Sequence, residues 1–570
     1  MAPKTLDTDI LILGSGGAGL FAALHAHKAD PSLAITVAVK GLLGKCGCTR
    51  MVQGGYNVAL AKEDSVERHF MDTIEGGKWL PDQELAWRLV TLAVERIREL
   101  ENELGCFFDR NPDGTVHQKA FAGQTFDRTV HKGDLTGIEI INRLAEQVWA
   151  RKIRRLEEFR AIELVKSRTS SAIAGVLFID MRSGEYVFVR AKAVLLATGG
   201  GPTMYKFHTP SGDKSCDGLA MALRAGLPLR DLEMVQFHPT GLYAGMHTRM
   251  TGTVLEEGLR GSGGYLLNGA KERFMPQYDP KAERATRDLV SRAMYSEMRK
   301  GNTSPNGGLY ISMQHLNKEQ TRKQFRGMVE RCADCGFDLA GGLVEVVPTA
   351  HYMMGGVEFA PDCSTELQGL FVAGEDAGGV HGANRLGGNG VANSTVFGAV
   401  AGDSMAAWVK DKALADADAA SIEKAVSESE RPFAMKAASL EPLRERLYET
   451  MWNNVGIIRD AAGLRSGLGE LSALEGELND TGIADASRAF NLTWHDWLNL
   501  KSLVQASRAI AEAALARADS RGAHFREDFP ETGPLEGSCY TSLRSVGGAL
   551  RIGMKPVQFT RVRPGATLLK

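Results

Sequence analysis

The chain has 570 residues, of which 44% are hydrophobic and 24% charged, and its 67 basic residues nearly balance 69 acidic ones. A net charge of −2 gives no electrostatic case for nucleic-acid binding. The eight cysteines lack the density of a secreted disulfide scaffold. We find no apolar run of about 18 residues and no convincing targeting segment, so we expect a cytoplasmic protein without a membrane span.

The first informative segment lies near the N-terminus. A short apolar run at 9–13 is followed at once by a glycine-rich turn, and 20–28 has a helical pattern. Within the turn, Gly14 makes the bend, Gly16 lets the backbone approach a pyrophosphate and Gly19 allows close helix packing. The helix N-terminus then faces the phosphate charge. This order predicts a dinucleotide site; the alternative is a glycine-rich turn that binds no ligand.

The later strands favour FAD over NAD. The second predicted strand, 34–39, ends at Lys40, where an NAD-binding unit would have an acidic residue for the ribose. A later apolar run ends in Thr198-Gly199-Gly200, a sequence typical of FAD proteins. The stretch around Glu375 resembles the acidic segment that holds the flavin ribitol in those proteins.

Three further stretches contain candidate anion-binding side chains. They begin at Gln236, His351 and His381, and they carry His238, His351 and Arg385. A guanidinium can bind a carboxylate through two parallel charged hydrogen bonds. Two imidazoles and a guanidinium that converge in space would suit an anionic substrate. The plainer alternative is that each histidine is a satisfied structural residue.

Together these motifs resemble the flavoprotein subunit of succinate dehydrogenase and fumarate reductase, of which L-aspartate oxidase is a relative. The resemblance runs from Asp9 to about Pro530 and is carried, in family order, by 53–55, 236–241, 260–265, 351–356, 381–389 and 520–524. It implies an α/β fold: a discontinuous FAD-binding Rossmann-like domain (1–233 and 347–412), an inserted α+β capping domain (234–346) and a C-terminal helical domain (413–530). We expect Asp411–Glu430 to be a linker and the tail, 531–570, to contain a strand at Pro556–Val562.

The resemblance also implies a reaction. FAD N5 exchanges hydride with one carbon of a carbon–carbon bond in a dicarboxylate such as succinate or fumarate, and Arg287 exchanges a proton with the neighbouring carbon. Glu257 and Arg260 would resupply that proton. Two alternatives are structural: an Arg287–Asp288 salt bridge, and an ordinary surface helix pair of Glu257 with Arg260.

Substrate and cofactor contacts follow in the same way. His351 and Arg385 would hold one carboxylate, and His238 would help to hold the other. The expected FAD contacts are Gly14, Ser15, Gly16, Gly17, Ala18, Gly19, Lys40, Cys48, Thr49, Gln53, Gly54, Gly55, Thr198, Gly199, Gly200, Asp217, Glu375, Arg385 and Asn389.

The mode of flavin attachment departs from the respiratory members. They tether FAD through a histidine five residues before Gln-Gly-Gly, and that position is Cys48 here. A histidyl link there is excluded, so we expect noncovalent FAD; a cysteinyl link is the alternative.

A second departure concerns the substrate. The family has a threonine before the relay glutamate, whereas this chain has Glu256. Because a second carboxylate would repel a substrate carboxylate, we hypothesise that the substrate end facing Glu256 is neutral or cationic. The alternative is that Glu256 points away from the substrate.

Two other functions are therefore alternatives to the dicarboxylate reaction. One is an L-aspartate-oxidase-like flavin oxidase acting on an amino dicarboxylate, which the stretch His131–Gly137 resembles. The other is a non-catalytic FAD-bearing assembly subunit.

The lone Cys332-x-x-Cys335 has too few ligands for a zinc site, and no iron–sulfur ligation pattern is visible. We expect no bound metal. If electrons leave the flavin through clusters, a separate iron–sulfur or other electron-transfer subunit must carry them, and that partner could attach the chain peripherally to a membrane. The other expected partner is a small carboxylic acid substrate.

Overall fold

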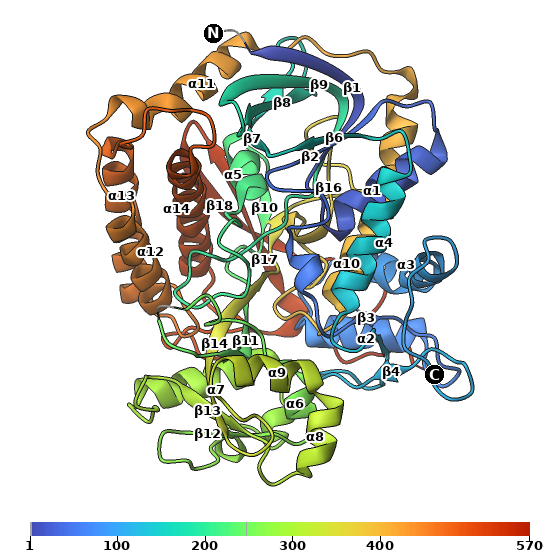
Figure 1. Cartoon of the computed structure of the whole chain (residues 1–570), viewed down its shortest axis with the longest axis vertical. Coiled ribbons are helices and arrows are strands. Elements are labelled where there is room, and N and C mark those ends of the chain that lie inside the picture. Colours follow the sequence, from blue (N-terminus) through green and yellow to red (C-terminus); the bar gives the residue numbers. More distant parts are fainter. Residues whose placement is uncertain (1–2, 247, 570) are drawn as a thin grey trace.

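A seven-stranded sheet forms the centre of the fold in the computed structural model, which describes residues 3–246 and 248–569 (Figure 1). Its order is β6-β2-β1-β9-β8-β7, with β16 also paired to β9. The pairs among β6, β2, β1, β9 and β16 are parallel, while β7 and β8 are antiparallel additions. The strands are β1 (Lys4–Leu13), β2 (Ile35–Val39), β6 (Arg154–Glu157), β7 (Phe159–Lys166), β8 (Ile173–Asp180), β9 (Glu185–Leu196) and β16 (Leu370–Val372).

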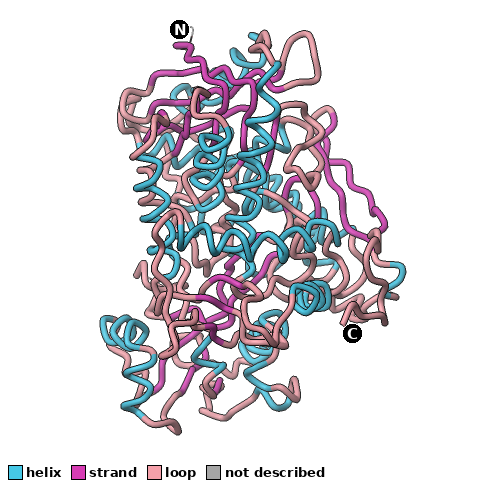
Figure 2. Tube along the Cα trace, turned by 90° about the vertical axis from the view of Figure 1, so that its right-hand side faces the viewer, coloured by secondary structure: helices cyan, strands magenta, loops and turns pink. Residues whose placement is uncertain are grey.

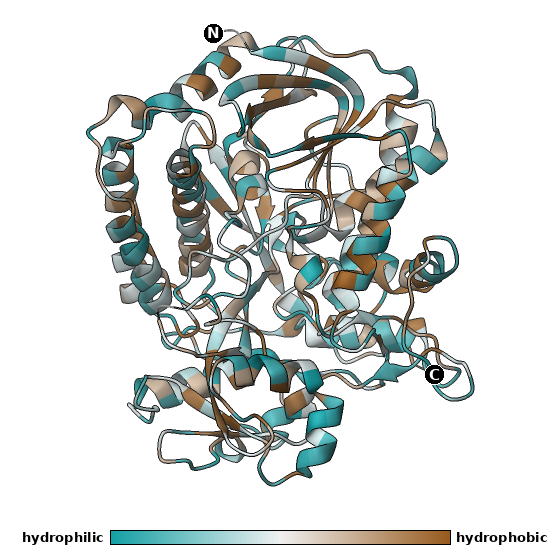
Figure 3. Ribbon diagram, viewed as in Figure 1, coloured by the Kyte–Doolittle hydropathy of each residue, from teal (hydrophilic) through white to brown (hydrophobic). Residues whose placement is uncertain are grey.

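Helices cover both faces of this sheet, which explains why its parallel strands are continuous apolar runs. One face packs against α1 (Gly17–Ala29), α3 (Gln83–Asn102), α4 (Thr136–Trp149) and α10 (Asn389–Trp408). The other face packs against α5 (Asp217–Arg224) and the C-terminal helices. Helices α1 and α10 approach so closely that a side chain at Gly398 would collide with the backbone of Ala18. Figure 3 shows brown, hydrophobic segments along the central strands and teal faces on the outer helices α12 and α13.

Two small sheets flank the centre. One has the order β3-β5-β4, from β3 (Tyr56–Asn57), β4 (Gln118–Lys119) and β5 (Thr129–Val130), beside α2 (Val66–Gly76). The other has the order β15-β10-β17-β18, from β10 (Leu229–Arg230), β15 (Gly356–Val357), β17 (Cys539–Val546) and β18 (Ala549–Pro556). Strand β17 pairs with β10, so the C-terminal hairpin packs on the same chain.

A fourth sheet, with four strands, lies at the lower end of Figure 1 and has its own apolar core. Its order is β11-β14-β13-β12, from β11 (Val235–Leu242), β12 (Tyr265–Leu267), β13 (Leu309–Ser312) and β14 (Leu343–Met353). Helices α6 (Gly258–Gly261), α7 (Arg287–Arg299), α8 (Lys318–Gln324) and α9 (Arg326–Asp334) belong to the same part of the chain. We call this part the cap. Strand β14 runs across the expected boundary at 346/347, so the strand itself connects the cap to the FAD-binding part.

The C-terminal helices are α11 (Ala419–Ala434), α12 (Glu441–Asn454), α13 (Ala461–Asp480) and α14 (Leu492–Ala516). Two local predictions were wrong. The expected linker Asp411–Glu430 contains most of α11. The helix begins there because Asp418 caps its N-terminus by accepting from Ala420 N. Of the expected strand Pro556–Val562, only Pro556 lies in a strand, as the last residue of β18, and the residues after it are irregular.

The mixed helix and strand architecture, with a dinucleotide-type sheet, a cap and C-terminal helices, confirms the predicted fold class. Figure 2, seen from the side, shows the strands of the cap below the main body and the C-terminus on the lower half of the molecule. Among the described helices, none has both the length and the apolar character needed to cross a bilayer.

Candidate active site

A large cavity extends from the glycine turn after β1 to the cap. One end is lined by the expected dinucleotide contacts, including Gly14, Lys40, Thr198 and Asp217. The other end is lined by His238, Glu256, Glu257, Arg287, His351 and Arg385. Side chains expected to bind cofactor and substrate therefore share one cavity, which spans the FAD-binding part and the cap.

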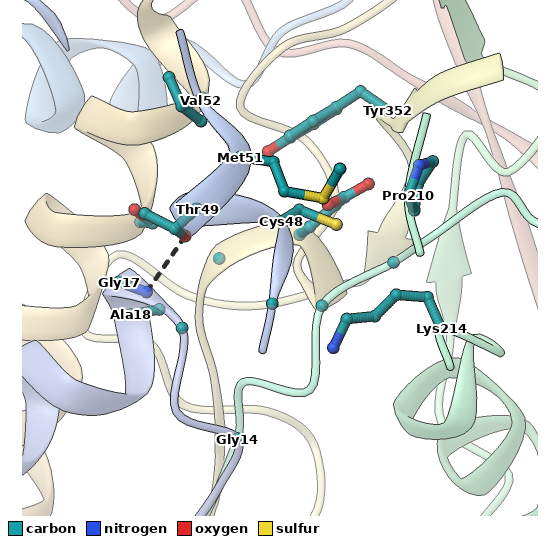
Figure 4. A pocket seen from close by; sticks show the side chains of 18 of the residues that line it. Gly14, Gly17, Ala18, Cys48, Thr49, Met51, Val52, Pro210, Lys214 and Tyr352 are labelled. Carbon is teal, nitrogen blue, oxygen red and sulfur yellow. Dashed lines mark hydrogen bonds between the residues drawn. The ribbon is translucent and has the colours of Figure 1, made fainter. Parts of the chain in front are cut away.

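The glycine turn leaves the first end open for phosphates. Gly14 has φ of 109° and packs so closely on Ala197 that any side chain there would collide with the backbone. The first residue of α1, Gly17, donates its N–H to Thr49 Oγ1 at 3.1 Å (Figure 4). The N-cap residue Gly16 brings no capping side chain, so the start of α1 faces the cavity as bare backbone. This arrangement fits a pyrophosphate.

An ion pair follows at the end of β2. Lys40 Nζ donates to Asp217 Oδ2 at 2.8 Å, and Arg160 donates to Asp217 Oδ1 at 2.9 Å. Burial opposes ionisation of Asp217, but Arg160 and Lys40 hold the pKa of this carboxyl group below its ordinary value. Lys40 is thus fixed at the position where NAD-binding units carry an acidic residue.

The second glycine turn is held by an acidic neighbour. Asp376 accepts from the Thr198 hydroxyl at 2.9 Å and from Gly199 N at 3.2 Å. Beside it, Glu375 accepts from Met353 N at 2.9 Å, which connects the flavin side to the end of β14. The space in front of Gly199, where a side chain would stand, is open.

Sulfur-containing side chains line one part of the cavity. Figure 4 shows Cys48, Met51, Lys214 and Tyr352 around this part. Burial raises the pKa of the Cys48 thiol to about 12. The thiol is therefore protonated at neutral pH and is a poor nucleophile.

At the far end, two imidazoles come from paired strands. His238 lies on β11 and His351 on β14, and their ring centroids are 5.5 Å apart. Thr209 Oγ1 lies 2.9 Å from His351 Nδ1 and orients that ring. Burial first, and then nearby Arg287, lower the pKa of both imidazoles well below the ordinary value. Both rings are therefore neutral hydrogen-bonding groups at pH 7.

Arg385 is poised for an anion. Its guanidinium lies 4.4 Å from the centre of the Tyr352 ring and donates to Leu386 O at a long 3.4 Å. Its Nε has no partner among the described residues. Burial and nearby Arg287 lower the pKa of Arg385 to about 10, so the group remains charged at neutral pH. A buried cation with so few partners fits a carboxylate ligand.

Arg287 enters the cavity from the first turn of α7 and is paired. Its Nη2 and Nε donate to Glu257 Oε2 at 2.7 and 3.1 Å, and Nη1 donates to Gln236 Oε1 at 3.0 Å. Behind it, Arg260 Nη2 donates to Glu257 Oε1 at 3.2 Å. The side chains of Glu257 and Arg260 are 4% and 1% exposed, so the surface helix-pair interpretation is wrong.

The expected contacts do not all reach the cavity. Arg260 lies one layer behind its wall, and Gly19 serves packing against Gly14 rather than lining. Asn389 also turns away: its amide accepts from Asn57 at 2.8 Å and donates to Thr73 at 3.1 Å. The other expected contact residues line the cavity.

Sequence reasoning missed several supporting side chains. Gln236 joins Arg287 to the 381–389 stretch by donating to Arg385 O at 2.7 Å. Thr209 orients His351, and Lys119 forms an ion pair with Glu256. No motif marks Lys119 or Thr209; Gln236 lies in a motif that was interpreted for its histidine alone.

The fold and this cavity define an FAD-dependent oxidoreductase with an anion-binding end. The FAD binding domain family matches residues 9–391, and the fumarate reductase flavoprotein C-terminal family matches 444–568. One subunit of the fumarate reductase (CoM/CoB) of Methanothermobacter marburgensis is 39% identical over 94% of this chain and 96% of its own. A variant of Escherichia coli quinol fumarate reductase FrdA superposes with a TM-score of 0.93, at 31% identity over 99% of both chains. Sdh1 of Mycobacterium smegmatis superposes with a TM-score of 0.87, at 34% identity over 97% of this chain and 95% of its own.

The chain belongs to the succinate dehydrogenase and fumarate reductase flavoprotein family, and its cofactor is FAD. This confirms the resemblance seen in the sequence and favours that interpretation over the amino-acid oxidase.

Proposed function

We propose that this chain is the flavoprotein subunit of a fumarate reductase and interconverts fumarate and succinate. The observation that carries the proposal is the position of Arg287. This arginine lines the cavity from the cap, as Arg385 does from the FAD-binding part, and it is buried with a carboxylate and a second arginine behind it. Fumarate reduction needs groups that hold the two carboxylates of the substrate and a protonated group that donates to its carbon–carbon bond. Arg385 and the two histidines can hold the carboxylates, and Arg287 can donate the proton.

Each residue then has a role. The residues that line the flavin end of the cavity would hold FAD, which when bound would supply the hydride chemistry at one carbon of the substrate. Arg287 moves a proton to or from the neighbouring carbon, and Glu257 accepts hydrogen bonds from both Arg287 and Arg260, so protons can be resupplied along that path. Arg385 and His351 hold one carboxylate, and His238 contributes to the other. The buried position excludes water and strengthens these charged contacts.

The cofactor would be noncovalent. Cys48 lines the cavity, but its protonated thiol disfavours attack on the flavin ring. Lys40 and Asp217 would contact the cofactor together as an ion pair, while Thr198, Gly199 and Glu375 would line its middle.

We also propose that the chain works in the cytoplasm beside an iron–sulfur or other electron-transfer subunit, which could attach it peripherally to a membrane. Support comes from relatives that are named as subunits of fumarate reductases. The domain boundaries at 233/234, 346/347, 412/413 and 530/531 remain part of the same proposal.

A substrate panel tests the function. The purified protein is assayed with a reduced one-electron dye as donor and fumarate, crotonate or an amino dicarboxylate as acceptor, and with succinate in the opposite direction. We expect turnover with fumarate and much less with the monocarboxylate crotonate, because crotonate leaves one anchor empty. Hydrogen peroxide production from aspartate, without fumarate turnover, would instead establish an oxidase.

A further inference from the structure

Glu256 places a carboxylate in the wall of a site that must accept a dianion. Its side chain is 8% exposed and lines the substrate end of the cavity, next to Glu257. Unlike Glu257, which is paired with Arg287 and Arg260, Glu256 has no arginine partner among the described residues. An uncompensated carboxylate here would repel the substrate carboxylate nearest to it.

Lys119 supplies the missing charge from outside the cavity. Its ammonium group forms an ion pair with Glu256 Oε1 and donates to Gly133 O at 3.4 Å. The lysine side chain is 21% exposed and is not among the residues that line the cavity. The Lys119 ammonium therefore contacts the wall residue rather than the substrate.

The small sheet fixes this position. Lys119 lies on β4, where it pairs with Thr129 of β5, and β5 pairs in turn with β3. Phe121, two residues further on, lines the cavity, and its ring lies 5.8 Å from the Lys119 ammonium. The ion pair thus connects the β3-β5-β4 sheet to the cap segment that precedes α6.

We propose that Lys119 is a specificity-determining residue, which converts Glu256 into half of a neutral ion pair so that a dicarboxylate can bind beside it. The proposal rests on the proposed function. It replaces the expectation that the substrate end facing Glu256 must be neutral or cationic, because the ion pair removes the repulsion on which that expectation depended. Lys119 and Glu256 act on substrate binding and leave proton transfer to Arg287.

The test compares the direction in which KM for fumarate changes in three variants. Lys119→Met leaves Glu256 uncompensated, so the KM for fumarate should rise about tenfold or more while kcat changes little. Glu256→Gln leaves the lysine cation unpaired, so KM should fall, by about threefold. The double variant should return to within about threefold of wild type, because both charges are gone. Bound FAD, measured by absorbance, should be the same in all three.

A binding readout separates this inference from the proposed function. Malonate, a dicarboxylate with no adjacent pair of CH groups to oxidise or reduce, is titrated into each oxidised holoenzyme and followed by the flavin absorbance change. Its Kd should shift in the same directions as KM. If the wild type does not turn over fumarate, the proposed function fails, and the malonate series still decides the role of Lys119.

Lys206→Met is the matched control. Lys206 is 26% exposed and pairs with Glu449 at 2.5 Å, away from the cavity, so its removal should change neither KM nor the malonate Kd. If both single variants weaken binding, the ion pair serves to hold the β3-β5-β4 sheet against the cap, and the proposal is overturned. Unchanged binding in either single variant overturns it as well. Should Lys119→Met fail to fold, tighter binding by Glu256→Gln still decides in favour of the proposal, and weaker or unchanged binding against it.

Discussion

Glu257 accepts two hydrogen bonds from Arg287, at 2.7 and 3.1 Å, through one carboxylate oxygen and receives Arg260 on the other. Burial opposes ionisation of Glu257, but the two arginines hold the pKa of its carboxyl group below the ordinary value. Beyond Arg260, the next contact is the backbone oxygen of Glu283 at 2.7 Å. The three side chains form a continuous charged path that ends at the cavity, which is the arrangement a proton donor in a dry site requires.

Arg287→Met should abolish fumarate reduction without loss of the cofactor. General acid catalysis contributes about 10²- to 10⁴-fold, so we expect kcat to fall by at least about a hundredfold. Steady-state fumarate reduction by a reduced dye measures this change. The FAD content and the rate of flavin reduction by dithionite should match wild type. Activity within about threefold of wild type would show that another group donates the proton.

Arg385→Lys should impair substrate binding despite keeping the charge. An ammonium cannot make two parallel hydrogen bonds to one carboxylate, nor stack on Tyr352 as the guanidinium does. We expect the malonate Kd to rise by roughly tenfold or more, because a buried charged hydrogen bond contributes about 1.5–3 kcal/mol. An unchanged Kd would remove Arg385 from the set of anion anchors.

FAD should separate from the protein on denaturation. Because burial raises the pKa of the Cys48 thiol to about 12, attack on the flavin ring is disfavoured. Acid precipitation should leave the yellow colour in the supernatant, both for wild type and for Cys48→Ala. Colour that stays in the wild-type pellet and is lost in the variant would instead establish a cysteinyl link.

The carboxyl group of Asp376 should make the apoprotein less stable as pH rises. Burial raises its pKa to about 7, although hydrogen bonds from Thr198 and Gly199 oppose the shift. The unfolded chain has an Asp pKa of about 4, so the stabilising contribution is fully present below about pH 4 and is lost as pH rises through about 7. Denaturant unfolding of wild type and Asp376→Asn between these values measures the difference. The stability gap should change with pH in favour of the variant; a constant gap would contradict the assignment.

Much of the flavin end could be predicted because its chemistry is local in sequence. The strand, glycine turn and helix around Gly14 are consecutive, so one motif fixes the fold and the phosphate site together. Arg287, Glu257 and Arg260 were assigned from family motifs, and the structure brings them into contact.

The parts of the site that could not be predicted depend on contacts between segments that are distant in the sequence. Lys119 is in a two-residue strand, and its partner Glu256 is 137 residues away, so no local pattern reveals the pair. Asn389 lies in a recognised motif, but the start of α10 directs its side chain towards Asn57 and away from the cavity.

The C-terminal hairpin is signalled in the sequence by the consecutive glycines Gly547 and Gly548, and this signal was overlooked. Gly547 and Gly548 have φ of 60° and 83° and join β17 to β18 as a two-residue turn. Two successive residues with positive φ are typical of the turn that matches the twist of a hairpin. The β-branched residues of Pro556–Val562 predicted a strand, but a strand also needs a neighbour with which to pair.

The most direct measurement is an anaerobic one. Wild-type protein is reduced with dithionite until its flavin absorbance is bleached, excess reductant is removed, and the protein is mixed with fumarate. We expect rapid recovery of the oxidised flavin spectrum with formation of one succinate per flavin, and no recovery in Arg287→Met. A wild-type flavin that stays reduced in fumarate, yet recovers its spectrum on exposure to oxygen, would contradict the central claim that this cavity reduces a dicarboxylate carbon–carbon bond.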